Sequence, residues 1–80
     1  MEDREEFKAY KEELLGMVNS INSEIPLTEE NQVLIVYELD TTEKIRAWFR
    51  WIVTNMKDGK LQATEEEIVR AAVKASKGLI

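Results

Sequence analysis

Apolar residues recur at spacings of three and four along most of this chain, and this period constrains the fold more than any other feature. Such a repeat places apolar side chains on one face of an α-helix. The clearest case predicts a helix over residues 3–22, with a stripe formed by Phe7, Tyr10, Leu14, Met17, Val18, Ile21 and Ile25. Asp3 and Glu6 form a candidate capping box at its start. Pro26 ends the helix, because the residue before a proline disfavours helical backbone.

The same period predicts a second strong helix over residues 41–57. Asp40 and Glu43 form a candidate capping box before it. Its apolar face is wide and consists of Ile45, Trp48, Phe49, Ile52, Val53 and Met56. We expect Asp58-Gly59 to end this helix, because Gly59 can adopt the left-handed conformation that a helix C-terminus commonly needs.

A further helix is predicted over residues 64–77. Thr64 and Glu67 have the spacing of a capping box, and Gly78 suits the C-terminal end. The apolar face is narrower here and is made of small and branched residues: Ile68, Val69, Ala72, Val73 and Ala75.

The segment at residues 28–39 is ambiguous. The run from Val33 to Tyr37 is β-branched and aromatic, which alone is typical of a strand. A strand needs a partner, and the sequence offers no second strand-like run. We therefore interpret the segment as a short, largely buried helix with Thr28 as its N-cap, and the strand remains the alternative.

Four helices in 80 residues leave only short connections, around residues 24–27, near Asp40 and over residues 58–63. The predicted fold class is all-α: a single domain over residues 1–80, built as a compact bundle of four short helices. In such a bundle, helices joined by short loops run antiparallel.

The composition excludes the commonest forms of catalysis. The chain contains no cysteine and no histidine, so thiol chemistry, histidine bases and the usual transition-metal ligands are absent. Asp58-Gly59-Lys60 superficially resembles part of a calcium loop, but Asn55-Met56-Lys57 precedes it where oxygen ligands are required. The numerous glutamates lie on polar helix faces. We predict no enzymatic activity, no cofactor and no metal.

Charge is divided unevenly along this acidic chain, whose net charge is −5. Residues 1–43 hold 12 acids and 3 bases, whereas residues 44–80 hold 4 acids and 8 bases. This division favours contacts between the two halves within one molecule or between two. The acidic N-terminus does not resemble a secretory signal, and the longest apolar run is residues 33–37. We therefore expect a cytoplasmic protein that does not span a membrane.

Trp51 is the residue that bears most directly on function. On a helical wheel it points away from the stripe around Trp48, Phe49 and Ile52. Trp and Arg dominate many binding interfaces, so we predict a non-enzymatic protein-interaction module: an adaptor, inhibitor or accessory subunit, or a chain that self-associates. The candidate partner-binding face consists of Trp51, Arg50, Lys44, Ala47 and Thr54. The alternative is structural, with the helix packed on both sides and Trp51 in the core.

The distribution of charge is compatible with two other functions. Basic residues interleaved with tryptophans over residues 44–60 are typical of nucleic-acid binding, but Glu65, Glu66 and Glu67 would repel phosphates at the start of the next helix. Nucleic acid is therefore a less favoured partner. The acidic first helix is the basis of the other alternative, a protein that mimics nucleic acid.

Overall fold

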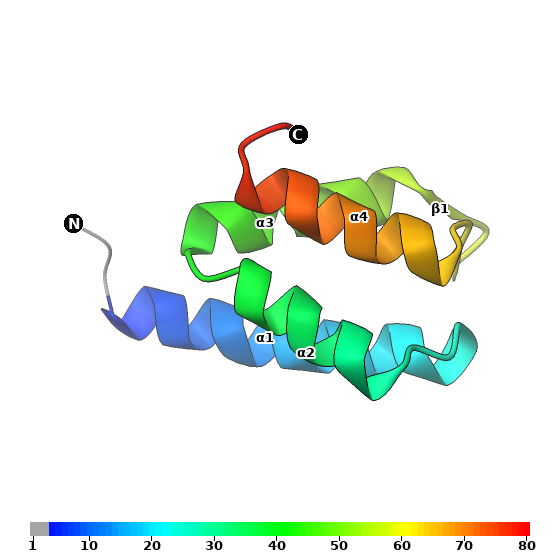
Figure 1. Ribbon diagram of the computed structural model, residues 1–80, viewed down its shortest axis with the longest axis horizontal. Coiled ribbons are helices and arrows are strands. Elements are labelled where there is room, and N and C mark those ends of the chain that lie inside the picture. The colour runs from blue at the N-terminus through cyan, green and yellow to red at the C-terminus, as the bar shows by residue number, and fades with distance from the viewer. Residues whose placement is uncertain (1–3) are drawn as a thin grey trace.

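The computed structural model describes residues 4–80, and four helices account for most of them (Figure 1). The helices are α1 (Arg4–Glu24), α2 (Glu29–Glu38), α3 (Thr42–Thr54) and α4 (Glu65–Ser76). The predicted all-α bundle of four helices is confirmed. Residues 29–38 form a helix and not a strand. The predicted cap at Asp3 lies outside the described residues.

The helices form two layers, with α1 and α2 in one and α3 and α4 in the other (Figure 1). Consecutive helices run antiparallel, so α2 and α4 run in the same direction. Contacts are most extensive between α3 and α4, followed by the contacts that join the layers, α2 with α4 and α1 with α3. Of these four neighbouring pairs, α1 and α2 contact each other least.

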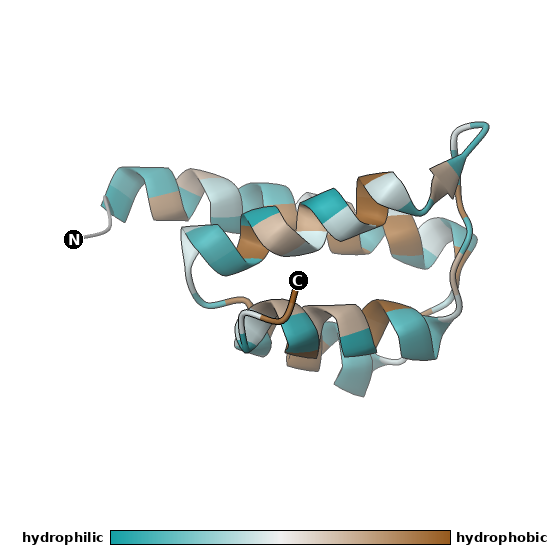
Figure 2. Cartoon of the chain, turned by 90° about the horizontal axis from the view of Figure 1, so that it is seen from above, coloured by the Kyte–Doolittle hydropathy of each residue, from teal (hydrophilic) through white to brown (hydrophobic). Residues whose placement is uncertain are grey.

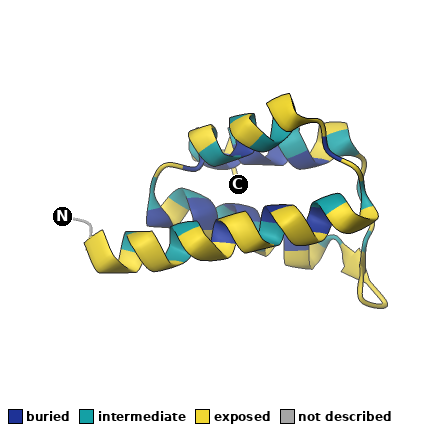
Figure 3. Cartoon of the chain, turned by 90° about the horizontal axis from the view of Figure 1, so that it is seen from below, coloured by how far each residue is buried: buried dark blue, intermediate teal, exposed yellow. Residues whose placement is uncertain are grey.

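The core lies between the two layers, and Trp48 is its largest fully buried side chain. The indole Nε1 of Trp48 donates a hydrogen bond of 3.2 Å to the carbonyl oxygen of Ile68, which satisfies the buried donor. Other fully buried side chains come from every helix and from one loop: Leu14, Ile35, Leu39, Ile45, Ile52 and Ile68. Figure 2 shows that each helix contains both hydrophobic and hydrophilic residues. Figure 3 shows that the buried positions of each helix face the other helices.

Threonines cap three of the helices. Thr28, Thr41 and Thr64 each have extended backbone, and each side-chain oxygen accepts a hydrogen bond from the backbone N–H three residues later. The capping box predicted at Thr64 and Glu67 is present. The one predicted at Asp40 is wrong, because the adjacent Thr41 takes the capping position.

Helix α3 ends at Thr54, which is earlier than predicted. The chain then forms a hairpin of two short strands, β1 (Met56–Lys57) and β2 (Lys60–Leu61), in which Met56 pairs with Leu61. Asp58 and Gly59 form the turn, and their φ angles of 53° and 76° suit the two-residue turns that fit strand twist. Gly59 does have the left-handed conformation that was predicted, but it closes the hairpin and does not end a helix.

This hairpin changes the predicted apolar face of α3. Met56 lies in β1, outside the helix, and both Met56 and Val53 are exposed to solvent. The helix therefore buries a narrower face, formed by Thr42, Ile45, Trp48 and Ile52. At the end of α4, the N–H of Leu79 bonds the carbonyl of Lys74 and that of Gly78 bonds the carbonyl of Ala75, so Gly78 ends the helix as predicted.

Candidate functional site

The face predicted on the third helix is distributed over several environments. Trp51 is half-buried against α4, where it shares a shallow hollow with Glu67, Arg70, Ala71 and Lys74. Ala47 is also half-buried and packs against the core. Arg50 and Thr54 are exposed, and the Thr54 hydroxyl donates to the backbone oxygen of Arg50 at 2.8 Å. Helix α4 therefore covers part of Trp51, while Arg50 and Thr54 remain in solvent.

Lys44, the fifth residue of that face, lies at the opposite end of the helix. Its ammonium nitrogen Nζ is 2.7 Å from Oδ1 of Asp40. This hydrogen bond from Lys44 lowers the pKa of Asp40, against a smaller opposing effect of burial. Lys44 thus serves the junction between α2 and α3, three residues before Ala47 and six or more before Arg50, Trp51 and Thr54.

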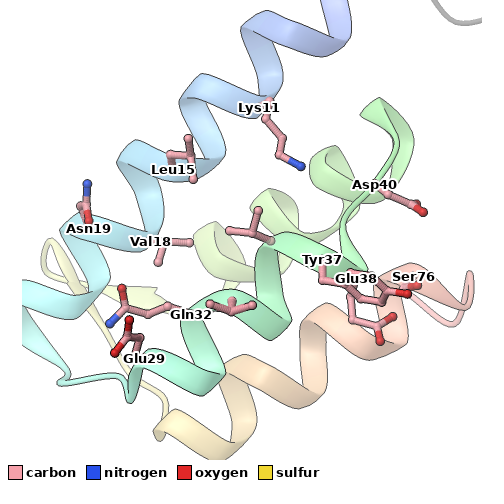
Figure 4. A pocket seen from close by; sticks show the side chains of 12 residues that line it. Lys11, Leu15, Val18, Asn19, Glu29, Gln32, Tyr37, Glu38, Asp40 and Ser76 are labelled. Carbon is pink, nitrogen blue, oxygen red and sulfur yellow. The ribbon is translucent and has the colours of Figure 1, made fainter.

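A groove with a volume of about 950 Å³ lies between α1 and α2 (Figure 4). Lys11, Leu15, Val18 and Asn19 line it from α1. Its other wall is formed mainly by α2, through Glu29, Gln32, Val33, Val36, Tyr37 and Glu38, and it is completed by Asp40 and Ser76. The limited contact between these two helices leaves the groove open along their length.

The groove is apolar at its walls. Leu15 is 46% exposed, Val33 is 63% exposed and Tyr37 is 76% exposed. Val18, which is buried, and Val36, which is half-buried, extend this apolar surface toward the interior. Helix α2 is therefore not the largely buried helix that was predicted, because it buries Ile35 and leaves Val33 and Tyr37 in solvent.

The rim of the groove is acidic. Glu29 and Glu38 lie at the two ends of α2, and Asp40 follows in the loop. Lys11 is the basic residue among the lining residues, which gives the lining a net charge of −2. The ammonium of Lys11 lies 5.6 Å from the centre of the Phe7 ring, within range of a cation–π contact.

A smaller hollow of about 380 Å³ lies between α1 and α3 and has the opposite charge. Tyr10, Arg46, Phe49, Arg50, Val53 and Thr54 line it. This basic surface includes part of the predicted nucleic-acid face. Trp48, however, is 0% exposed and is not available for stacking on bases, and Trp51 is half-buried against α4.

Glu65 makes the clearest polar contact between distant segments. Its Oε2 accepts hydrogen bonds of 2.7 Å from the backbone N–H of Thr28 and from Nδ2 of Asn31. The bond from Thr28, followed by that from Asn31, lowers the pKa of Glu65. The contact attaches the start of α2 to the start of α4 and so fixes one wall of the groove.

Sequence reasoning did not find the groove. Leu15 lies beside the main stripe of α1, and Val33 and Tyr37 are four residues apart on one face of α2. These apolar positions are visible in the sequence. The prediction of a largely buried helix over residues 28–39, however, assigned Val33 and Tyr37 to the interior and not to a surface.

Comparison with known proteins gives no match among family models, curated proteins or solved structures. Over residues 4–80, no cluster of three or more acidic side chains is arranged to hold a metal ion. Within the same residues, no helix has both the length and the apolar character needed to cross a membrane.

Proposed function

We propose that this protein is a non-enzymatic protein-interaction module that binds a segment of another polypeptide in the groove between α1 and α2. The observation that carries the proposal is the gathering of Leu15, Val33 and Tyr37, all exposed, along one concave surface. Exposed apolar side chains are ordinary when scattered, but a contiguous set beside a polar rim is typical of an interaction site. The expected cytoplasmic location belongs to the same proposal, supported by the absence of cysteine.

The energetics favour an occupied groove. Burying a large apolar side chain completely contributes about 1.5–3 kcal/mol. Leu15, Val33 and Tyr37 are roughly half to three-quarters exposed, so a partner that covers them gains about 1 kcal/mol or more from each. A chain of 80 residues has a thin core and commonly uses most of its large apolar side chains within it. Other large apolar side chains, such as Val53 and Met56, are exposed as well, but Leu15, Val33 and Tyr37 line one groove together, which is consistent with a binding role.

This proposal keeps the class of function predicted from the sequence but moves the binding surface. The face around Trp51 packs partly against α4, whereas the groove offers a larger and more apolar surface. The inhibitor, adaptor and accessory-subunit roles all remain consistent with a groove that receives a segment of a partner.

The test is a selection of peptides from a random displayed library on the wild-type chain. Each selected peptide is then titrated against Val33→Asp and Val53→Asp. The two valines are matched, since both lie on helices and are 63% and 64% exposed, but only Val33 lines the groove. A carboxylate placed in an apolar contact costs several kcal/mol unless it is paired, so we expect Val33→Asp to weaken binding about tenfold or more.

Val53→Asp should leave the affinity of the same peptides unchanged. Circular dichroism of both variants shows whether each retains the wild-type helicity. If the selected peptides respond to Val53→Asp and not to Val33→Asp, the binding surface is α3 and the groove proposal is wrong.

A further inference from the structure

We infer that the groove receives an amphipathic α-helix whose apolar stripe is bordered by lysine and arginine residues. This inference rests on the proposed function, because it names the class of partner for the same groove. Two properties of the groove support it: its two helical walls and the sign of the charge at its rim.

The walls decide the conformation of the occupant. Helices α1 and α2 satisfy their backbone groups internally and offer no strand edge with which an extended peptide could pair. An extended segment in this apolar groove would lose the hydration of its backbone without regaining hydrogen bonds, which is costly. A helix satisfies its own backbone and packs its side chains between those of two flanking helices.

The dimensions of the groove set the length of the occupant. The wall formed by α2 contains 10 residues, which corresponds to a length of about 15 Å. A partner helix of about three to four turns spans it. Such a helix presents apolar residues at spacings of three and four to Leu15, Val33 and Tyr37.

The charges at the rim of the groove determine which residues should border the apolar stripe of the bound helix. Among residues 4–80 the ion pairs are Lys44 with Asp40 and Arg70 with Glu66, so neither pair neutralises Glu29 or Glu38. These two glutamates mark the two ends of the same wall. Lysine or arginine on the occupant would meet them from either end, whereas an acidic helix or an anionic lipid surface would be repelled.

The experiment uses three synthetic peptides of about 14 residues, long enough for four helical turns. All three carry leucine at the same positions, with spacings of three and four, and the remaining positions are lysine in one, glutamate in the second and glutamine in the third. Binding of each labelled peptide to the wild-type chain is followed by fluorescence anisotropy. The lysine peptide should bind most tightly, and its affinity should fall between about 0.02 M and 0.2 M salt because screening weakens exposed charge pairs.

Matched double variants then test the role of the rim. Glu29→Gln with Glu38→Gln removes the two charges at the groove, and we expect it to weaken binding of the lysine peptide about two- to tenfold. Glu13→Gln with Glu24→Gln changes the net charge equally, but both residues are exposed on α1 and neither lines the groove. This control should bind like the wild type.

The outcomes separate this inference from the proposed function. If the glutamine or glutamate peptide binds as tightly as the lysine peptide, and Val33→Asp weakens that binding, the inference is wrong and the groove function stands. If no peptide binds, and library selection yields none sensitive to Val33→Asp, both fail. If analytical ultracentrifugation shows a dimer that Val33→Asp dissociates, the occupant is a second copy of this chain and the inference is wrong.

Discussion

The two tryptophans allow one chemical change to be compared in two environments. Trp48→Phe removes the indole donor that bonds the oxygen of Ile68 and leaves space in a fully buried site. Trp51→Phe is the same change three residues later, at a half-buried position against α4. The difference between their free energies of unfolding therefore measures how much more the fold depends on Trp48 than on Trp51.

Two contributions determine how much Trp48→Phe lowers the free energy of unfolding. Loss of the hydrogen bond costs about 1 kcal/mol, and the cavity left by the smaller ring costs about 1 kcal/mol more. Trp48→Phe should therefore lower the free energy of unfolding by about 2 kcal/mol, out of about 4–12 kcal/mol for a chain of this length. Trp51→Phe should lower it by less than about 1 kcal/mol, because the site is only partly buried.

Urea unfolding followed by circular dichroism measures both values. With a denaturant dependence of about 1 kcal/mol per molar urea, the midpoint should shift by about 2 M for Trp48→Phe and by less than about 1 M for Trp51→Phe. Equal shifts, or a larger shift for Trp51→Phe, would refute the assignment of Trp48 as the central core residue.

Two glycines and one carboxylate give further predictions. Gly16→Ala should raise the free energy of unfolding by about 0.5–1 kcal/mol, because alanine favours the helix and a methyl group there meets nothing within 4 Å beyond its chain neighbours and the backbone of its own helix. Gly59→Ala should lower the free energy of unfolding by about 1–2 kcal/mol, since its φ of 76° disfavours a side chain. Urea unfolding checks both. The hydrogen bonds from Thr28 and Asn31 lower the pKa of Glu65 from its ordinary value of 4.5, so the stability they contribute is present above that value and is lost as the pH falls through the lowered pKa. Glu65→Gln should therefore reduce stability at neutral pH and flatten its decline in acid, as measured by unfolding at several pH values; an unchanged acid decline would contradict this.

Local signals allowed much of the fold to be predicted. A threonine cap acts over three residues, so Thr28 and Thr64 could be assigned from sequence alone. Asp40 and Thr41 are both good capping residues, and only the backbone geometry shows that Thr41 accepts the hydrogen bond from Lys44. The end of α3 was missed because strands of two residues are too short to show alternation.

The candidate site depended on packing between distant segments and could not be predicted in the same way. The sequence shows that Val33 and Tyr37 are apolar, but not whether α1 covers them. That depends on how closely α1 approaches α2, which is determined by the contacts of both helices with the other layer. The surroundings of Trp51 could not be predicted for a related reason, since a helical wheel does not show where α4 lies.

The common direction of α2 and α4 has an electrostatic consequence (Figure 1). Each helix carries the equivalent of about half a positive charge at its N-terminus, so two helices that start side by side repel one another at that end. Five glutamates in the first turns oppose this repulsion: Glu29, Glu30, Glu65, Glu66 and Glu67. Glu65 does so for both helices at once, because it belongs to the first turn of α4 and accepts the N–H of Thr28 at the start of α2. One carboxylate thus compensates the N-terminal charge of both helices and links the start of α2 to the start of α4.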